Sequence, residues 1–148
     1  MWDLQPANLY KYFTNNANVN NVNDEKFIYK ELSYRIVGLI YTVYNALGYG
    51  YREKYYERAL AKEFKKVGLA YEVQKTIPLK YEGEIIGKYI IDFVVEDKIV
   101  LELKVMNSIR NKDLQQILSY LTANNLKLGI LALITRNGVR YRRILNTR

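Results

Sequence analysis

The sequence predicts one domain in which helices cover a partly antiparallel sheet, an α/β or α+β arrangement of layers. Apolar residues first recur at helical spacing in two successive segments. Three short runs rich in β-branched residues then follow, separated by turn signals. A third helical segment precedes a continuous apolar run and a final alternating segment. The element order is therefore ααβββαββ, without the regular repeat of a βαβ protein.

The first helix is predicted from about residue 31 to 47 and ends at "GYG", residues 48–50. Its apolar positions are three and four residues apart: Leu32, Ile36, Leu39, Ile40, Val43 and Leu47. The second helix is predicted over residues 51–67, with Gly68 as its stop. The side chains expected to face inward from it are Tyr56, Leu60, Phe64 and Val67.

Strands are expected at about residues 70–77, 85–95 and 98–106, with a turn at "YEGE", residues 81–84. The segment "NKDLQQILSYLTANN" returns to helical spacing. After it, "LKLGILALIT" is typical of a central strand that is covered on both faces. "RNG" predicts a turn, and "VRYRRIL" predicts an exposed edge strand.

Composition limits the possible chemistry. The chain of 148 residues has the length of about one domain. It contains neither cysteine nor histidine, which excludes disulfides, Cys or His zinc sites, thiol nucleophiles and Ser-His-Asp triads. An enzyme with this composition would depend on carboxylates, Lys, Tyr, Ser or Thr, with a hard metal ion as the natural helper.

The N-terminal residues 1–26 are expected to be a flexible arm, and residues 27–148 a single domain. Residues 14–26 contain six asparagines and almost nothing that could pack. The aromatic patch before them, with Trp2, Tyr10 and Phe13, could dock on the domain or join two copies in a homodimer. No apolar segment suits a signal peptide or a membrane span, so a cytoplasmic protein without a membrane partner is expected.

The stretch "IDFVVEDKIVLELK" places charged residues inside an otherwise apolar hairpin. Glu102 and Lys104 share one face of their strand, opposite Leu101 and Leu103. A buried carboxylate requires an ion partner or a metal. Asp92 opposes Glu102 only if the loop has an odd length centred on Asp97, or if a bulge compensates; a two-residue turn would send the two acids to opposite faces.

Asp92 and Glu102 could then hold one Mg²⁺ through their oxygens, beside Lys104. A metal in that place would activate water and neutralise charge on a phosphoryl oxygen, which predicts phosphodiester hydrolysis. An isolated pattern of this kind is more often a surface salt bridge. Glu53 and Glu57 add support, because they are one helical turn apart and at least one should face the sheet. Gln116 is a polar residue among apolar neighbours on the third helix, where an ordinary exposed side chain is the competing interpretation.

These segments together resemble the GxxExxR proteins, a branch of the PD-(D/E)XK nuclease superfamily. The matching stretches are "GYREKYYE" at 50–57, "IDF" at 91–93, "LELK" at 101–104, "QILSYL" at 116–121 and "KLG" at 127–129. They occur in the family's order and span about residues 31–146. The sequence departs from the pattern at Tyr56, where the motif has arginine, and in "ILALIT", where relatives more often have an asparagine near the end.

The resemblance implies a restriction-endonuclease-like αβββαβ core, a mixed sheet flanked by helices, with an extra N-terminal helix. It implies Asp92, Glu102 and Lys104 as the metal-binding and catalytic triad. It adds a helical glutamate, Glu53 or Glu57, as a metal ligand, and Gln116 as a supporting group. Mg²⁺ or Mn²⁺ would be the cofactor, and DNA or a structured nucleic acid the substrate.

Charge agrees with a nucleic-acid partner. The formal net charge is +8, from 23 Lys and Arg against 15 Asp and Glu. The arginines expected to contact nucleic acid are near the C-terminus: Arg136, Arg140, Arg142 and Arg143. A metal-dependent nuclease is the leading hypothesis. The alternative is a catalytically silent nucleic-acid-binding or protein-docking module on the same fold, to which fifteen tyrosines would be suited.

Overall fold

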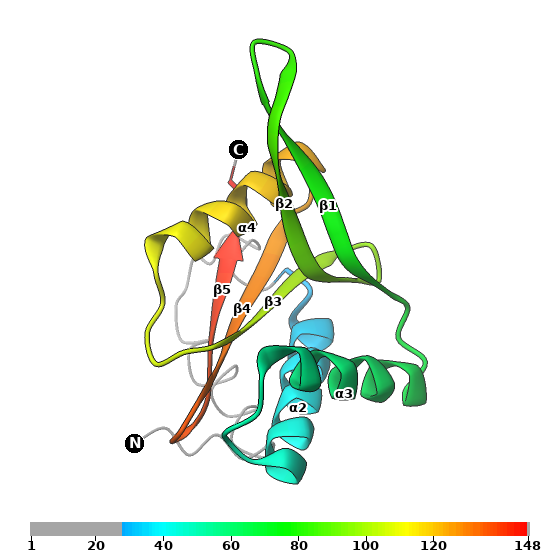
Figure 1. The fold of residues 1–148 in the computed structure, drawn as a ribbon. Coiled ribbons are helices and arrows are strands. Elements are labelled where there is room, and N and C mark those ends of the chain that lie inside the picture. Colours follow the sequence, from blue (N-terminus) through cyan, green and yellow to red (C-terminus); the bar gives the residue numbers. More distant parts are fainter. Residues whose placement is uncertain (1–27, 148) are drawn as a thin grey trace, which may run out of the picture.

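The computed structural model describes residues 28–147, so the predicted N-terminal arm lies outside the described residues. A five-stranded mixed sheet has the order β1-β2-β3-β4-β5, in which only β3 and β4 are parallel (Figure 1). The elements are α2 (Lys30–Leu47), α3 (Glu53–Lys66), β1 (Tyr71–Tyr81), β2 (Glu84–Val95), β3 (Ile99–Val105), α4 (Asn111–Ala123), β4 (Leu128–Thr135) and β5 (Gly138–Leu145). The predicted element order is confirmed.

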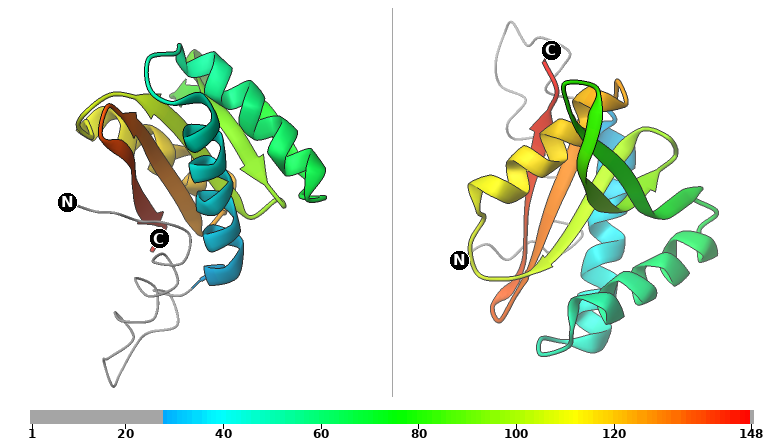
Figure 2. Two further views of the ribbon diagram at one scale, coloured as in Figure 1. Left: turned by 90° about the horizontal axis from the view of Figure 1, so that it is seen from below. Right: turned by 45° about the horizontal axis from the view of Figure 1, so that its top comes forward.

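The helices lie on both faces of the sheet. Figure 2 shows α2 and α3 on one face and α4 on the other. One apolar core fills the layer between the sheet and α2 and α3, and includes Phe64, Phe93 and Leu101. A second, smaller core lies beneath α4 and includes Ile117 and Leu131. Because helices cover both faces of the sheet, β4 is buried along its whole length, as its continuous apolar sequence predicted.

The helix ends follow the glycines that the sequence indicated. Gly48 (φ 72°) and Gly68 (φ 74°) adopt left-handed conformations just beyond α2 and α3, where a residue with a Cβ would be strained. The expectation that Val67 faces inward is wrong, because this residue is 44% exposed. It lies just past the last residue of α3, and Leu69 packs in the core in its place.

β1 and β2 form a hairpin that is longer than predicted and extends beyond the rest of the sheet (Figure 1). The turn is at Glu82 and Gly83, inside "YEGE" as expected, and both residues have positive φ. The additional length was not foreseen because the far half of the hairpin is exposed on both sides. Tyr81 and Ile85, for example, are 64% and 67% exposed, so no buried face gives the sequence a regular pattern there.

The connection between β2 and β3 has the odd length that is needed for Asp92 to oppose Glu102. Val95 pairs with Ile99, which leaves Glu96, Asp97 and Lys98 outside the ladder. Glu96 and Asp97 both have positive φ, and the Lys98 N–H donates to the Val95 carbonyl at 3.0 Å. A tight turn is therefore followed by one extra residue, and the register directs Asp92 opposite Glu102.

β5 is an edge strand, as predicted, and pairs with β4 alone. Gly129 on β4 allows α4 to approach closely, since a Cβ there would lie 2.4 Å from Cγ2 of Ile117. Across residues 28–147, no helix combines the length and apolar character needed to cross a membrane.

Candidate active site

The site forms where β2 and β3 separate. Their ladder covers only three residue pairs, from Val95 and Ile99 to Phe93 and Leu101. Beyond it β2 continues into the long hairpin, whereas β3 continues beside β4 (Figure 1). Separating strands leave backbone N–H groups that need acceptors, and Asp92 and Glu102 are the next residues on each strand.

These two acids supply the missing acceptors to each other's strand. Oε1 of Glu102 accepts a hydrogen bond from the Asp92 N–H at 2.7 Å. Oδ2 of Asp92 accepts one from the Leu103 N–H at 2.8 Å. Both acids are buried, with exposures of 7% for Asp92 and 2% for Glu102. The two carboxylates are thus held rigidly at the point of separation.

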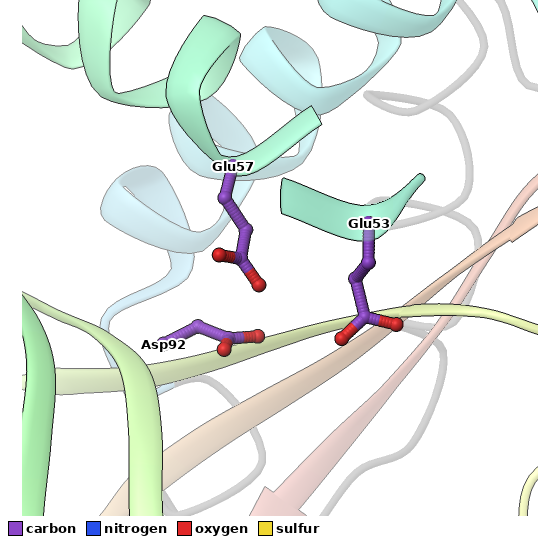
Figure 3. A group of neighbouring side chains, drawn as sticks. All are labelled: Glu53, Glu57 and Asp92. Atoms are coloured by element: carbon purple, nitrogen blue, oxygen red, sulfur yellow. The ribbon is translucent and has the colours of Figure 1, made fainter. Parts of the chain in front are cut away.

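The first two turns of α3 contribute two more acids, Glu53 and Glu57. Glu53, Glu57 and Asp92 each offer a carboxylate oxygen, and these oxygens lie within 4.8 Å of one another. Figure 3 shows both helical side chains directed toward Asp92. Glu53 is fixed further by the Val105 N–H, which donates to its Oε2 at 3.1 Å. The sequence left open which helical glutamate belongs to the site, and the structure brings both there.

An irregularity in β1 and β2 accounts for the position of Asp92. Phe93 packs in the α2 and α3 core, so regular alternation would put Ile91 there as well, yet Ile91 packs beneath α4. The break coincides with a missing pair in the β1–β2 register opposite Gln74, which is left-handed at φ 52°. This local change of direction allows Asp92 to reach the acids of α3.

Gln74 is a neighbour of the acidic residues that no sequence pattern predicted. Its Nε2 donates to Oε2 of Glu57 at 3.4 Å. A non-glycine residue with positive φ inside a strand is strained, and such strain is concentrated at functional sites. Nothing in the sequence marks this residue, because a glutamine in an exposed strand is ordinary.

Lys104 is the cation of this group. Its Nζ lies 3.6 Å from Oε2 of Glu102 and 3.8 Å from Oε1 of Glu53. Glu102 therefore has one oxygen near Lys104 and the other on the Asp92 N–H, and it does not belong to the group of three mutually close acids. The name acidic site is used below for Glu53, Glu57, Asp92 and Glu102 together with Lys104.

Four acids and one lysine leave the acidic site with excess negative charge. Burial and the neighbouring Asp92 raise the pKa of Glu102 to about 8. Burial, together with the charge of Asp92 and a hydrogen bond to it, raises the pKa of Glu57 to about 8. Burial also raises the pKa of Asp92. Burial lowers the pKa of Lys104, but the charges of Glu102 and Glu53 outweigh that effect and the net pKa is raised, so Lys104 stays protonated.

The donors in the acidic site fit a hard divalent cation. All of the close ligand atoms are carboxylate oxygens, the type that Mg²⁺ prefers. Two oxygens bound to one Mg²⁺ are at most about 4 Å apart, so a small movement of the side chains of Glu53, Glu57 and Asp92, whose oxygens lie within 4.8 Å of one another, would let them share one ion. A divalent charge would also relieve the repulsion that raises the pKa values of the acids.

The remaining predicted residues lie elsewhere. Gln116 on α4 donates to the Ile90 carbonyl at 3.1 Å, two residues before Asp92, and therefore contacts the backbone of β2 instead of a carboxylate. The four arginines do not share one face. Arg136, Arg140 and Arg142 are exposed, whereas Arg143 is half-buried on the opposite face of β5 and donates to the Ile28 carbonyl.

Comparison with known proteins agrees with this geometry. No curated protein matches the sequence. Among solved structures, the one titled "Crystal structure of SSO0001" superposes with a TM-score of 0.50 at 18% identity, over 93% of this chain and 75% of that one, which shows a shared fold. The family model of the PD-(D/E)XK nuclease superfamily matches residues 30–143, which include the whole acidic site. The chain belongs to the PD-(D/E)XK nuclease superfamily.

Proposed function

We propose that this protein is a metal-dependent nuclease that hydrolyses phosphodiester bonds in DNA, with Mg²⁺ or Mn²⁺ as cofactor. The observation that carries the proposal is the acidic site, where α3 and the separating strands β2 and β3 bring four carboxylates around one lysine. Membership of a nuclease superfamily supports the same reaction. Within the superfamily we propose the GxxExxR branch, because both glutamates of "GYREKYYE" reach the acidic site.

Each side chain has a distinct part in this proposal. Asp92, Glu53 and Glu57 would bind the metal ion, which would lower the pKa of a bound water and offset charge on the phosphoryl group. Glu102 fixes the Asp92 backbone and holds the Lys104 ammonium nearby. Lys104 would donate to the scissile phosphate or orient the attacking water, and its raised pKa keeps it able to donate.

The test is a cleavage panel on linear, flapped, branched and single-stranded DNA and on RNA, with Mg²⁺, Mn²⁺ or EDTA. We expect wild type to cleave DNA with either metal and to be inactive in EDTA. Glu102→Ala and Lys104→Met should each lower the cleavage rate by about a hundredfold or more, the usual loss when one charge-stabilising group is removed.

Matched controls come from α3 itself. Glu63 forms an ion pair with Lys66 on the outer part of the helix, and Lys62 is exposed there. Glu63→Ala and Lys62→Met should keep wild-type rates. Cleavage that survives Glu102→Ala and Lys104→Met would refute the mechanism. Metal-independent DNA binding without cleavage of any substrate would instead favour a silent binding module.

A further inference from the structure

Three exposed tyrosines lie at the start of α3, beside the acidic site but outside it. Tyr49 and Tyr51 belong to the connection between α2 and α3, and Tyr55 is in the first turn of α3. Their exposed fractions are 42%, 48% and 43%. The rings of Tyr51 and Tyr55 meet edge to face, with centroids 6.5 Å apart. These three residues are called the tyrosine patch.

Cations surround the tyrosine patch. Lys54 and Arg58 approach the Tyr55 ring, with Nζ and Cζ at 5.2 and 5.9 Å from its centroid. Arg136, from the turn between β4 and β5, lies over Tyr49 at 5.8 Å. Segments far apart in the sequence thus place aromatic faces and positive charge on one surface.

Charge is segregated across the N-terminal turns of α3. In "GYGYREKYYER", residues 48–58, the two acids Glu53 and Glu57 point into the acidic site (Figure 3). The three cations Arg52, Lys54 and Arg58 are exposed. A polyanion approaching from outside would therefore meet positive charge, with the metal ligands directly behind it.

The tyrosine patch is held in place by Tyr56, the residue that replaces the motif arginine. Its buried hydroxyl donates to the Gly48 carbonyl at 2.6 Å and accepts a hydrogen bond from the Tyr51 N–H at 3.4 Å. Both ends of the connecting loop are thus fixed to α3. Ordered aromatic side chains lose little entropy when a base stacks on them.

The acidic site is partly open to solvent at the start of α3. The side chain of Glu53 is 35% exposed and that of Lys104 is 22% exposed, whereas the side chain of Glu102 is 3% exposed. Glu53 begins α3 and follows Arg52 and Tyr51 directly. A strand whose phosphate enters the acidic site at Glu53 would therefore continue over the tyrosine patch.

We propose that the tyrosine patch binds an unpaired nucleic-acid strand, with bases stacked on Tyr49, Tyr51 and Tyr55 and phosphates held by the surrounding Lys and Arg. This inference deepens the proposed nuclease function by naming the form of the substrate. Unpaired bases are required because bases inside a duplex are already stacked and offer no face to a tyrosine.

Binding can be measured on the full chain in EDTA, so that no cleavage occurs. The probes are fluorescein-labelled poly(dT), poly(rU) and a DNA duplex of the same length. We expect wild type to bind an unpaired strand more tightly than the duplex, and the two single strands show whether DNA or RNA is preferred. Tyr49→Ala, Tyr51→Ala and Tyr55→Ala should each weaken single-strand binding by about fivefold to a hundredfold.

Three controls separate stacking from other effects. Tyr55→Phe keeps the ring and should bind like wild type. Tyr81→Ala removes a still more exposed tyrosine from the tip of the β1–β2 hairpin and should also bind like wild type. Arg58→Gln should weaken binding and make the slope of log affinity against log salt shallower by about 0.7, the value for one phosphate contact.

The outcomes distinguish this inference from the nuclease proposal. Binding that depends on the three tyrosines supports the tyrosine patch even if no substrate is ever cleaved. Equal binding of duplex and single strand, an equal loss in Tyr81→Ala, or no effect of the tyrosine variants would overturn it even if the protein is an active nuclease. Failure to bind any nucleic acid would also overturn it and leave the surface for a protein partner.

Discussion

Asp92 and Glu102 complete each other's hydrogen bonding at the point where their strands separate: the Asp92 N–H donates to Oε1 of Glu102 at 2.7 Å. The matching bond runs from the Leu103 N–H to Oδ2 of Asp92 at 2.8 Å. Carboxylates therefore take the place of a backbone ladder. The same two carboxylates also belong to the acidic site. Substituting Asp92 or Glu102 will therefore affect stability through the oxygen that accepts a backbone N–H, and activity through the other oxygen.

The first prediction separates these two roles at Glu102. Glu102→Gln keeps an oxygen for the Asp92 N–H, whereas Glu102→Ala leaves that buried donor without an acceptor. We expect Glu102→Ala to lower the free energy of unfolding by about 1–3 kcal/mol relative to Glu102→Gln. Both variants should lose metal-dependent cleavage. Urea denaturation and a cleavage assay measure the two effects, and equal stability of the variants would contradict the structural role.

The second prediction concerns pH. Glu57 and Glu102 have pKa values of about 8 in the fold, against 4.5 for an unperturbed glutamate. Between those pH values the folded chain binds more protons than the unfolded chain. The contribution of these groups to stability is therefore present at low pH and is lost as pH rises toward 8.

Urea denaturation in EDTA from pH 5 to 9 measures this dependence. The stability of wild type relative to Glu57→Gln and to Glu102→Gln should fall as pH rises, because an amide has no proton to release. Glu63→Gln, on the outer part of α3, should keep the wild-type slope. A wild-type curve parallel to those of both site variants would show that the acids are not perturbed.

The third prediction tests the turn that fixes the register. Glu96 and Asp97 are both left-handed, a conformation that glycine adopts without cost. Asp97→Gly should raise the free energy of unfolding by up to about 1 kcal/mol, without changing cleavage. Glu96→Gly should be about 1 kcal/mol less stable than Asp97→Gly, because Oε1 of Glu96 accepts the Ala70 N–H at 2.7 Å. Equal gains in both variants would mean that this bond does not stabilise the turn.

The fourth prediction concerns the contact between α4 and β4. A Cβ at Gly129 would lie 2.4 Å from Cγ2 of Ile117, so Gly129→Ala should destabilise the fold by about 1–3 kcal/mol. Ile117→Ala removes that atom, and the cost of Gly129→Ala should largely disappear in its background. Gly38→Ala, inside α2, is the matched control, because the Cβ it adds would meet no other atom within 4 Å. It should raise the free energy of unfolding by about 0.5–1 kcal/mol. Additive effects of Gly129→Ala and Ile117→Ala would contradict the close contact.

The order of the elements and the type of each could be predicted from the sequence alone. Periodicity reports which side of an element is buried, so α2, the central strand β4 and the edge strand β5 were all predictable. It also defined the condition for Asp92 to oppose Glu102, an odd loop centred on Asp97, which the pairing of Val95 with Ile99 meets. The absence of histidine and cysteine limited the candidate catalytic groups to carboxylates, Lys, Tyr, Ser and Thr.

The assembly of the acidic site depends on tertiary packing. Glu57 joins Glu53 and Asp92, Gln74 contacts Glu57, and Glu102 has one oxygen on the Asp92 backbone and the other near Lys104. Those contacts depend on where α3 docks against β3 and on where β2 leaves the ladder. Both are set by packing between segments far apart in the chain, and the periodicity of a single segment carries no information about them.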